Sequence, residues 1–387
     1  MKYLGMELPA LIEKSAVHTA QEISQQPDLW QNVWKGVHHN KPRLQNFLQS
    51  VLPQSKKIIL TGAGTSAFIG LSLSGIIQRK TKISTEAIAS TDLVSHPKNY
   101  FQPDVPTLVI SFARSGNSPE SVAVITLARE ICKTCFHLVI TCNSEGKLAR
   151  HGSTENNFVF ALPAEANDQS LAMTSSYTGM LLAGILIAHL EELDAAKKSV
   201  DVLSGYGRKI IDYYADDLAK IAQRKFNRAV FLGSGPFFGT ARESHLKLQE
   251  LTDGRIICKE DSFLGFRHGP KAVIDDTTLV FYIFSNEEYV SQYERDLVLS
   301  MKKGRPPMME IGIMESILTD IHLDQRIYLS ENGSRLTEEY LAVCSALPAQ
   351  ILGFFKSLHL GLRPDMPSVT GAITRVVEGV QIYDLNI

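Results

Sequence analysis

Apolar runs recur at a fixed spacing along this 387-residue chain. One run ends in a Gly-x-Gly turn at Gly62, and another ends in the same kind of turn at Gly233, an offset of 233 − 62 = 171 residues. Three pairs of runs share this offset: 59–61 with 230–232, 107–110 with 278–281, and 137–142 with 308–313. Several strand-like runs at one offset indicate two tandem copies of one α/β unit.

The pattern in the first copy predicts alternating strands and helices. The expected strands are 58–61, 83–88, 107–112, 137–142 and 158–162, and the expected helices are 65–80, 119–132 and 170–193. Short connections between such elements favour a parallel sheet covered by helices on both faces. The second copy repeats the scheme and ends in a helix near 338–360.

These elements predict an α/β protein with two tandem domains, each an α-β-α sandwich with a parallel sheet. The expected boundaries are a helical N-terminal segment at 1–50, a first domain at 51–195, a second domain at 196–361 and a C-terminal tail at 362–387. Residues 194–227 read as a helical linker between the copies, and 376–382 in the tail read as strand-like.

Composition narrows the function classes. Lys and Arg number 39 against 41 Asp and Glu, a net charge of −2, so no basic surplus indicates nucleic acid or a membrane surface as a partner. The N-terminus lacks the apolar core of a signal segment, and no apolar stretch is long enough to span a bilayer. We therefore expect a cytoplasmic protein.

The five cysteines do not predict a disulfide framework in a chain of this length. Cys132 and Cys135 have CxxC spacing, with His137 and Cys142 nearby, but no second cysteine pair completes a zinc site. Buried free thiols are the simpler interpretation. We expect no metal and no cofactor.

Hydroxyl side chains follow two neighbouring strands of the first copy. Thr65 and Ser66 open one predicted helix, and Ser115 and Ser118 open the next, directly before Pro119. Hydroxyls and free N–H groups at two helix N-termini suit a phosphate dianion. The turn at Gly62 lacks the third glycine of a dinucleotide fingerprint. The alternative is that these residues only cap their helices.

The second copy differs at the equivalent turns. There the chain carries Pro236-Phe237-Phe238 after one strand and Ser285-Asn286-Glu287-Glu288 after the next. An apolar turn and an acidic turn disfavour an anion. The sequence therefore predicts phosphate binding in the first copy alone.

Different chemistry follows in the second copy. Glu243, Lys247 and Glu250 are spaced to share one helical face. His268 lies in a turn before Gly269-Pro270. On residue type alone, the charges can be a surface ion pair and the histidine can be structural.

These motifs resemble those of the sugar isomerase (SIS) domain family. The shared motifs are Gly62-Ala63-Gly64-Thr65-Ser66, Ser115-Gly116-Asn117-Ser118, Leu246-Lys247-Leu248-Gln249-Glu250 and Arg267-His268-Gly269-Pro270. The double-domain arrangement is similar to the isomerase half of glucosamine-6-phosphate synthase. Within the family the chain is most similar to AgaS-type galactosamine-6-phosphate deaminase/isomerases, including the segments 22–27 and 170–176.

The resemblance implies a role for each matching residue. Glu250 takes the place of the base that moves a proton between C1 and C2, and Lys247 lies beside the developing enediolate or enolamine oxygen. His268 takes the place of the ring-opening residue, which in the family comes from the neighbouring subunit of a homodimer or larger homo-oligomer. The sugar phosphate is held by Thr65, Ser66, Ser115 and Ser118.

The chain also departs from the synthase pattern. Ala113 replaces a serine of the phosphate loop, and Arg114 replaces the glutamine that follows it. The synthase's catalytic lysine near the C-terminus has no counterpart, because no lysine occurs after Lys356. Arg375 is the last basic residue of the chain.

The residue types suit proton transfer. A histidine titrates near neutrality and serves ring opening, and one carboxylate accepts the C2 proton and returns it to C1. With an amine at C2 the same steps give a ketimine, which water hydrolyses with release of ammonia. The expected activity is conversion of galactosamine 6-phosphate to tagatose 6-phosphate and ammonia.

Two alternatives stay open. One is a tagatose-6-phosphate ketose/aldose isomerase without nitrogen loss. The other is a non-catalytic sugar-phosphate sensor, which residues 1–50 disfavour because they carry no basic recognition helix. A binding protein has no need of Glu250, Lys247 and His268 together.

Overall fold

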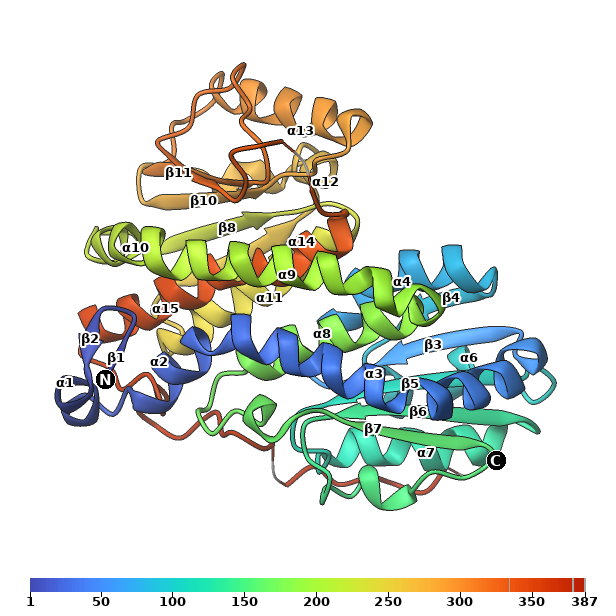
Figure 1. Cartoon of the computed structure of the whole chain (residues 1–387). Helices are drawn as coiled ribbons and strands as arrows, with labels where there is room; N and C mark the ends of the chain where they lie inside the picture. Colours follow the sequence, from blue (N-terminus) through green and yellow to red (C-terminus); the bar gives the residue numbers. More distant parts are fainter. Residues whose placement is uncertain (334, 378, 386–387) are drawn as a thin grey trace. The chain divides into compact units, whose positions relative to one another are not determined.

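The computed structural model describes residues 1–333, 335–377 and 379–385 (Figure 1). By its contacts the chain forms two compact units. Unit 1 contains 1–27, 169–174 and 198–372, and unit 2 contains 28–168, 175–197 and the described residues from 373 onward. The boundaries drawn from the sequence are contiguous stretches, whereas each unit is assembled from three separate segments.

Unit 2 is built on a five-stranded parallel sheet. Its strands are β3 (Lys57–Thr61), β4 (Ser84–Ala87), β5 (Thr107–Ala113), β6 (Cys135–Thr141) and β7 (Asn157–Ala161). They lie in the order β4-β3-β5-β6-β7. Strand order therefore reverses between β3 and β5, which is where doubly wound sheets bind ligands.

Helices cover both faces of this sheet. They are α3 (Gln26–Val51), α4 (Thr65–Thr81), α5 (Ser90–Ser95), α6 (Pro97–Tyr100), α7 (Pro119–Ile131) and α8 (Ser175–Ala188). On the α5 and α7 side, Ile59 and Val109 of the sheet pack with Leu93 and Val124 in one buried cluster. Strand residues buried on both faces explain why the sequence reads as continuous apolar runs.

Unit 1 contains a second sheet with the same strand order. Its strands are β8 (Arg228–Leu232), β9 (Ile257–Asp261), β10 (Thr278–Ile283), β11 (Met309–Met314) and β12 (Gln325–Tyr328), all parallel, in the order β12-β11-β10-β8-β9. Phe231 and Phe281 of adjacent strands stack with ring centroids 4.9 Å apart. The matching topologies confirm the tandem α/β fold.

Unit 1 contains the helices that pack around this sheet and also the N-terminal elements, of which α2 packs against α15. Its larger helices are α9 (Leu193–Lys209), α10 (Ala215–Ala222), α11 (Pro236–Leu251), α13 (Glu288–Met301), α14 (Glu338–Cys344) and α15 (Leu347–His359). The shorter elements are β1 (Lys2–Tyr3), β2 (Met6–Glu7), α1 (Leu8–Glu13), α2 (Val17–Ser24) and α12 (Phe263–Phe266). The β1–β2 pair is antiparallel and was missed in the helical N-terminal segment.

The repeat is less regular than the constant offset predicts. Leu108 pairs with Phe136, and its counterpart Leu279 pairs with Met309. The equivalent positions of β6 and β11 are therefore 309 − 136 = 173 residues apart in the sequence, whereas those of β5 and β10 are 279 − 108 = 171 residues apart. A shift of two residues preserves which side chains face the core, so the apolar pattern conceals it.

The predicted helix at 170–193 is too long. Helix α8 begins at Ser175, where the Asp168 carboxylate accepts hydrogen bonds from the backbone N–H of Ser175 (3.1 Å) and Ser176 (2.9 Å). The preceding segment is held in unit 1 instead, because the buried Glu22 carboxylate accepts the Ser170 N–H at 3.2 Å. A local side-chain cap from Asp168 and a contact from Glu22, distant in sequence, together set this boundary.

Two other expectations need comment. The tail segment 376–382 forms no strand in its described residues, and Glu378 lies outside them. One helical stretch, Glu338–His359, is long and apolar enough to cross a membrane, but 89% of its most apolar window is buried. That degree of burial is typical of a core helix of a globular protein.

Candidate active site

The two hydroxyl-bearing turns of unit 2 leave adjacent strands at the same edge of the sheet. Thr61, the last residue of β3, pairs with Ser111 of β5. The first turn connects β3 to α4 and the second connects β5 to α7. The structure therefore brings the four predicted phosphate-binding residues to the switch point of this sheet, at the N-termini of two helices.

Glycines shape the first turn. A Cβ atom at Gly62 would lie 2.7 Å from the backbone carbon of Ser66, and Gly64 has a φ of +56°. Only glycine permits this close approach followed by this backbone angle. The turn places Thr65 and Ser66 in the first turn of α4, where both are buried.

The second turn is held by hydrogen bonds between side chains and the backbone. The N–H of Asn117 donates to Ser115 Oγ at 3.2 Å, and the Asn143 amide donates to the Ser115 carbonyl at 2.9 Å. Gly116 has a φ of +64°. Ser118 precedes Pro119 at the start of α7, and its side chain makes no capping hydrogen bond to that helix. Capping therefore does not account for the Ser118 hydroxyl.

Three further hydroxyls at this edge were missed from the sequence. Thr61 Oγ1, Ser90 Oγ and Ser111 Oγ are buried and have no hydrogen-bond partner among the described residues. The backbone N–H of Ser90 donates to the Gly62 carbonyl at 2.8 Å, which places α5 beside the first turn. Unpaired buried hydroxyls are costly, and a polar ligand at the switch point can satisfy them.

Arg114 joins the second turn to the C-terminal tail. Its buried guanidinium donates to the backbone carbonyl of Arg375. Arg375 in turn donates to the Asp168 carbonyl at 2.8 Å and to the Asn167 side chain at 2.9 Å. The departure from the synthase pattern at Arg114 therefore holds the tail within unit 2.

The equivalent edge of unit 1 has the same first turn with different side chains. Gly235 has a φ of +56°, and a Cβ atom at Gly233 would lie 2.5 Å from the Phe237 carbonyl oxygen. The backbone of the turn is thus repeated, but Pro236 and Phe237 replace the threonine and serine.

The second turn of unit 1 is shorter and acidic. Ile283 and Phe112 hold equivalent register positions, and α13 begins five residues after Ile283 whereas α7 begins seven after Phe112. The backbone N–H of Ser285 donates to Glu294 at 2.8 Å, and its hydroxyl donates to Glu338 at 2.5 Å. Carboxyl groups of the protein itself accept the hydrogen bonds that this turn can donate, which disfavours binding of an anion there.

Helix α11 of unit 1 carries a chain of charges on its buried face. Lys247 is fully buried and its Nζ lies 2.8 Å from Glu250 Oε2 and 3.3 Å from Glu243 Oε1. Burial alone lowers the pKa of Lys247, but the two carboxylates outweigh it and raise the pKa above its usual value. Lys247 is therefore an ammonium ion at neutral pH.

The exposure of these groups differs along the helix. The Glu243 side chain is 0% exposed and the Glu250 side chain is 23% exposed. The buried Glu243 holds the buried Lys247, and Lys247 in turn holds Glu250, whose carboxylate solvent or substrate can reach. Glu243 was not among the predicted site residues, although its spacing of four from Lys247 was the available signal.

His268 lies apart from these charges in an exposed turn that follows α12. Phe263 and Phe266 anchor α12 in the core, and Ser262 caps it by accepting the Gly265 N–H at 3.0 Å. Gly269, with a φ of +117°, turns the chain after His268. Within the described residues the imidazole makes no hydrogen bond or ion pair, so the structure does not join it to Glu250 or Lys247.

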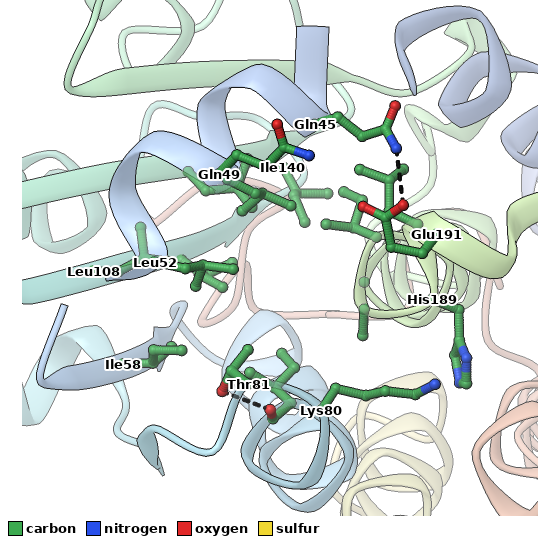
Figure 2. Close-up of a pocket in the computed structure, with 18 of the residues that line it drawn as sticks. Gln45, Gln49, Leu52, Ile58, Lys80, Thr81, Leu108, Ile140, His189 and Glu191 are labelled. Carbon is green, nitrogen blue, oxygen red and sulfur yellow. Dashed lines mark hydrogen bonds between the residues drawn. The ribbon is translucent and has the colours of Figure 1, made fainter. Parts of the chain in front are cut away.

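A cavity of ≈ 460 Å³ lies within unit 2, and Figure 2 shows the side chains that line it. Its walls are mainly apolar and come from α3, α4, α8 and the sheet, and they include Leu52, Leu108 and Ile140. At its rim Lys80 pairs with Glu192 at 2.8 Å. None of the predicted site residues lines it, and apolar walls do not suit a sugar phosphate.

The described residues contain no group of three or more His, Cys, Asp or Glu side chains placed to hold a metal ion. Cys135 Sγ lies 3.4 Å from His137 Nε2. Burial raises the pKa of the Cys135 thiol to about 12, so this thiol is protonated and unreactive at neutral pH.

Comparison with known proteins places this arrangement in a family. The SIS domain matches residues 51–190. The D-galactosamine-6-phosphate deaminase AgaS of Shewanella sp. (strain ANA-3) is 38% identical over 96% of this chain and 93% of its own length. AgaS of Escherichia coli O157:H7 is 38% identical over 94% of this chain and 95% of its own.

Solved structures agree over the whole fold. Tagatose-6-phosphate ketose/aldose isomerase from Escherichia coli has a TM-score of 0.86 at 36% identity, covering 96% of this chain and 97% of that one. A Clostridium novyi protein, solved as a candidate enzyme of the same kind, has a TM-score of 0.96 at 41% identity with complete coverage of both chains. The fold and site therefore define a double-domain SIS protein. More particularly, the chain belongs to the AgaS family.

Proposed function

We propose that this protein is an amino-sugar-phosphate deaminase/isomerase that converts D-galactosamine 6-phosphate to D-tagatose 6-phosphate and ammonia. Full-length similarity to AgaS deaminases supports the reaction. The structural observation that carries it is Glu250, a partly exposed carboxylate held at 2.8 Å by the buried ammonium of Lys247. Such a pair suits a base that shuttles one proton and a cation that stabilises the oxygen formed beside it.

Substrate binding is assigned to unit 2. The sugar phosphate accepts hydrogen bonds from the hydroxyls of Thr65, Ser66, Ser115 and Ser118. The N-termini of α4 and α7 add free N–H groups and a favourable dipole. The glycine-built turns and the unsatisfied hydroxyls of Thr61 and Ser111 at the same edge support this assignment.

The chemistry begins with ring opening by His268. Glu250 then removes the proton from C2 of the open aldehyde, and Lys247 stabilises the negative charge that develops on the C1 oxygen. Return of the proton to C1, together with transfer of a proton from the C2 nitrogen to the C1 oxygen, gives a hydroxymethyl group at C1 and an imine at C2. Water adds to the imine carbon, the C–N bond breaks, and ammonia leaves with the ketose as the second product.

A second candidate is a plain ketose/aldose isomerase. The observation that favours it is the close structural match to a protein solved as a tagatose-6-phosphate ketose/aldose isomerase. Both reactions use one base and one proton path, so the same residues serve either. They differ only in whether C2 carries nitrogen.

An ammonia-release assay separates the candidates. Purified protein is incubated with galactosamine 6-phosphate, glucosamine 6-phosphate and tagatose 6-phosphate in parallel. We expect ammonia from the galacto sugar alone. Aldose formation from tagatose 6-phosphate without any ammonia from the amino sugars identifies the isomerase. Binding of a sugar phosphate without turnover of any of the three identifies a sensor.

We further propose a cytoplasmic homodimer or larger homo-oligomer in which His268 acts on the neighbouring copy. The exposed position of His268 and its lack of contact with Glu250 support action in trans. Mixing inactive Glu250→Gln and His268→Asn chains tests it, because hybrid oligomers regain sites with both intact residues. No recovery of activity after mixing contradicts the proposal.

A further inference from the structure

Unit 1 contains a hollow of ≈ 530 Å³ lined by three cationic side chains, Arg267, Lys271 and Arg305. We call it the basic pocket. The rest of its lining is small or apolar and includes Gly269, Ala272 and Met301. Among the residues that line it there is no carboxylate. The charge of this hollow is therefore positive, although the whole chain has a net charge of −2.

Two segments distant in sequence form the basic pocket. One is the connection that follows α12 and holds Arg267 to Lys271. The other is the turn between α13 and β11, where Arg305 follows Lys302 and Lys303. Each segment is basic, with no acidic residue in 267–271 or 302–305, and the fold of unit 1 brings the two together.

The three cations are not neutralised by the protein. Within the described part of the chain, Arg267, Lys271 and Arg305 make no ion pair or hydrogen bond through their side chains. Other arginines of this unit are paired: Arg228 with Asp275 at 2.8 Å and Arg295 with Glu288 at 2.8 Å. Asp275, which is close in sequence to Lys271, forms its ion pair with Arg228 instead.

The charge and size of the basic pocket define a ligand class. The positive charge of two guanidinium groups and one ammonium is larger than the single negative charge of a carboxylate. Guanidinium groups also pair with phosphate oxygens in a bidentate manner. The volume lies in the range of small-molecule sites. We propose that the basic pocket binds a small phosphorylated molecule that carries two or more negative charges.

Such a ligand acts on the segment that carries His268. Arg267, Gly269 and Lys271 line the pocket, and His268 lies between the first two of them in the same stretch of chain. The positive φ of Gly269 marks a point where this stretch turns. An anion that bridges Arg267 and Lys271 to Arg305 fixes the stretch in place. This regulatory consequence rests on the proposed role of His268, whereas the binding itself does not.

Calorimetric titration with inorganic pyrophosphate tests the site. The full-length chain is used in a Ser115→Ala/Ser118→Ala background, which weakens binding at the switch point of unit 2. We expect one binding event per chain in that background. Adding Lys271→Gln and Arg305→Gln should weaken it at least tenfold, because two of the three cations are lost. The single substitutions should each have an intermediate effect.

The matched control is Lys302→Gln/Lys303→Gln, which removes the same charge from exposed residues that do not line the basic pocket. We expect less than a threefold change in affinity. Equal weakening by both pairs overturns the proposal, because binding then reflects only a diffuse positive field. No pyrophosphate binding in the serine background also overturns it. Ammonia release reports separately on the proposed function, so either can fail alone.

Discussion

Lys247 shows how a single buried charge organises the candidate site. Its ammonium is 0% exposed between Glu243, also 0% exposed, and the more accessible Glu250. Burying an ion is costly unless partners compensate it. Three charges on one helix face therefore act as a unit, and the loss of any one changes the other two.

Replacing Lys247 with Met should lower the free energy of unfolding by about 3–5 kcal/mol, because the buried carboxylate of Glu243 loses the ammonium 3.3 Å from it. Urea denaturation of the purified variant measures this. The double variant Glu243→Gln/Lys247→Met should recover much of the loss, since the fully buried negative charge is removed together with its ammonium and the remaining Glu250 is partly exposed. Equal stability of the two variants contradicts the account.

Glu294 is a second buried acid, and it makes stability depend on pH. Burial, helped by the nearby charge of Glu338 and opposed by the hydrogen bond from the Ser285 N–H, raises the pKa of Glu294 to about 8. The folded protein then keeps a proton that the unfolded chain releases above its ordinary pKa. Stability contributed by this group is therefore present at low pH and falls as pH rises towards 8.

Glu294→Gln should remove this dependence. Relative to wild type, the variant should gain up to about 1.4 kcal/mol for each pH unit between 5 and 8. Unfolding free energies at pH 5, 6.5 and 8 measure the gain. Asp296→Asn, an exposed acid on the same helix, is the control and should show no such trend. Parallel curves for Glu294→Gln and wild type contradict the buried protonated state.

At the scale of elements, the turns before α4 and α11 have the same backbone geometry in the two units. Gly64 and Gly235 both have φ values of +56°. Gly62 and Gly233 both lie too close to the following helix to carry a Cβ atom. Backbone sterics thus fix the same turn in both units, while the side chains that follow decide which turn suits an anion.

Gly62→Ala should lower the free energy of unfolding by about 1–3 kcal/mol and raise the KM for the sugar phosphate, because Thr65 and Ser66 are displaced. Gly75 is an exposed residue of α4, where an added Cβ atom would lie 3.7 Å from its nearest neighbour, the Arg79 side chain. Gly75→Ala should raise stability by about 0.5–1 kcal/mol. Thermal unfolding and steady-state kinetics of both variants check this contrast.

At the scale of the whole molecule, the two repeated units differ in the polar side chains that they carry. Unit 2 carries the hydroxyl turns, and unit 1 carries the charged side chains of Glu243, Lys247 and Glu250. In the second sheet Glu294 and Glu338 take up the donors of the corresponding turn. The two units therefore have one topology and different chemistry.

This division predicts separate kinetic effects. Glu250→Gln should reduce kcat by about 10²–10⁴ with little change in the affinity for sugar phosphate. Ser115→Ala and Ser118→Ala should each raise KM about tenfold or more, since each removes a hydrogen bond to a charged group. Initial-rate kinetics distinguish the two. Turnover near wild type in Glu250→Gln excludes it as the base.

The sequence by itself determined the strands of the two parallel sheets, the tandem repeat and the glycine turns. These depend on local periodicity and on backbone conformations that few residues can adopt. It also determined which turns bear hydroxyls and which helix bears the charges. The two-residue displacement of β11 was not visible, because an even shift leaves the alternation of buried side chains unchanged.

Only the tertiary structure decided which distant residues meet. The start of α8 depends on Asp168, and the position of the preceding segment depends on Glu22, about 150 residues earlier in the chain. Burial of Glu243 and the approach of Arg305 to Lys271 likewise follow from crossover connections and helix packing. Local patterns encode elements, whereas proximity across the chain is fixed when those elements pack together.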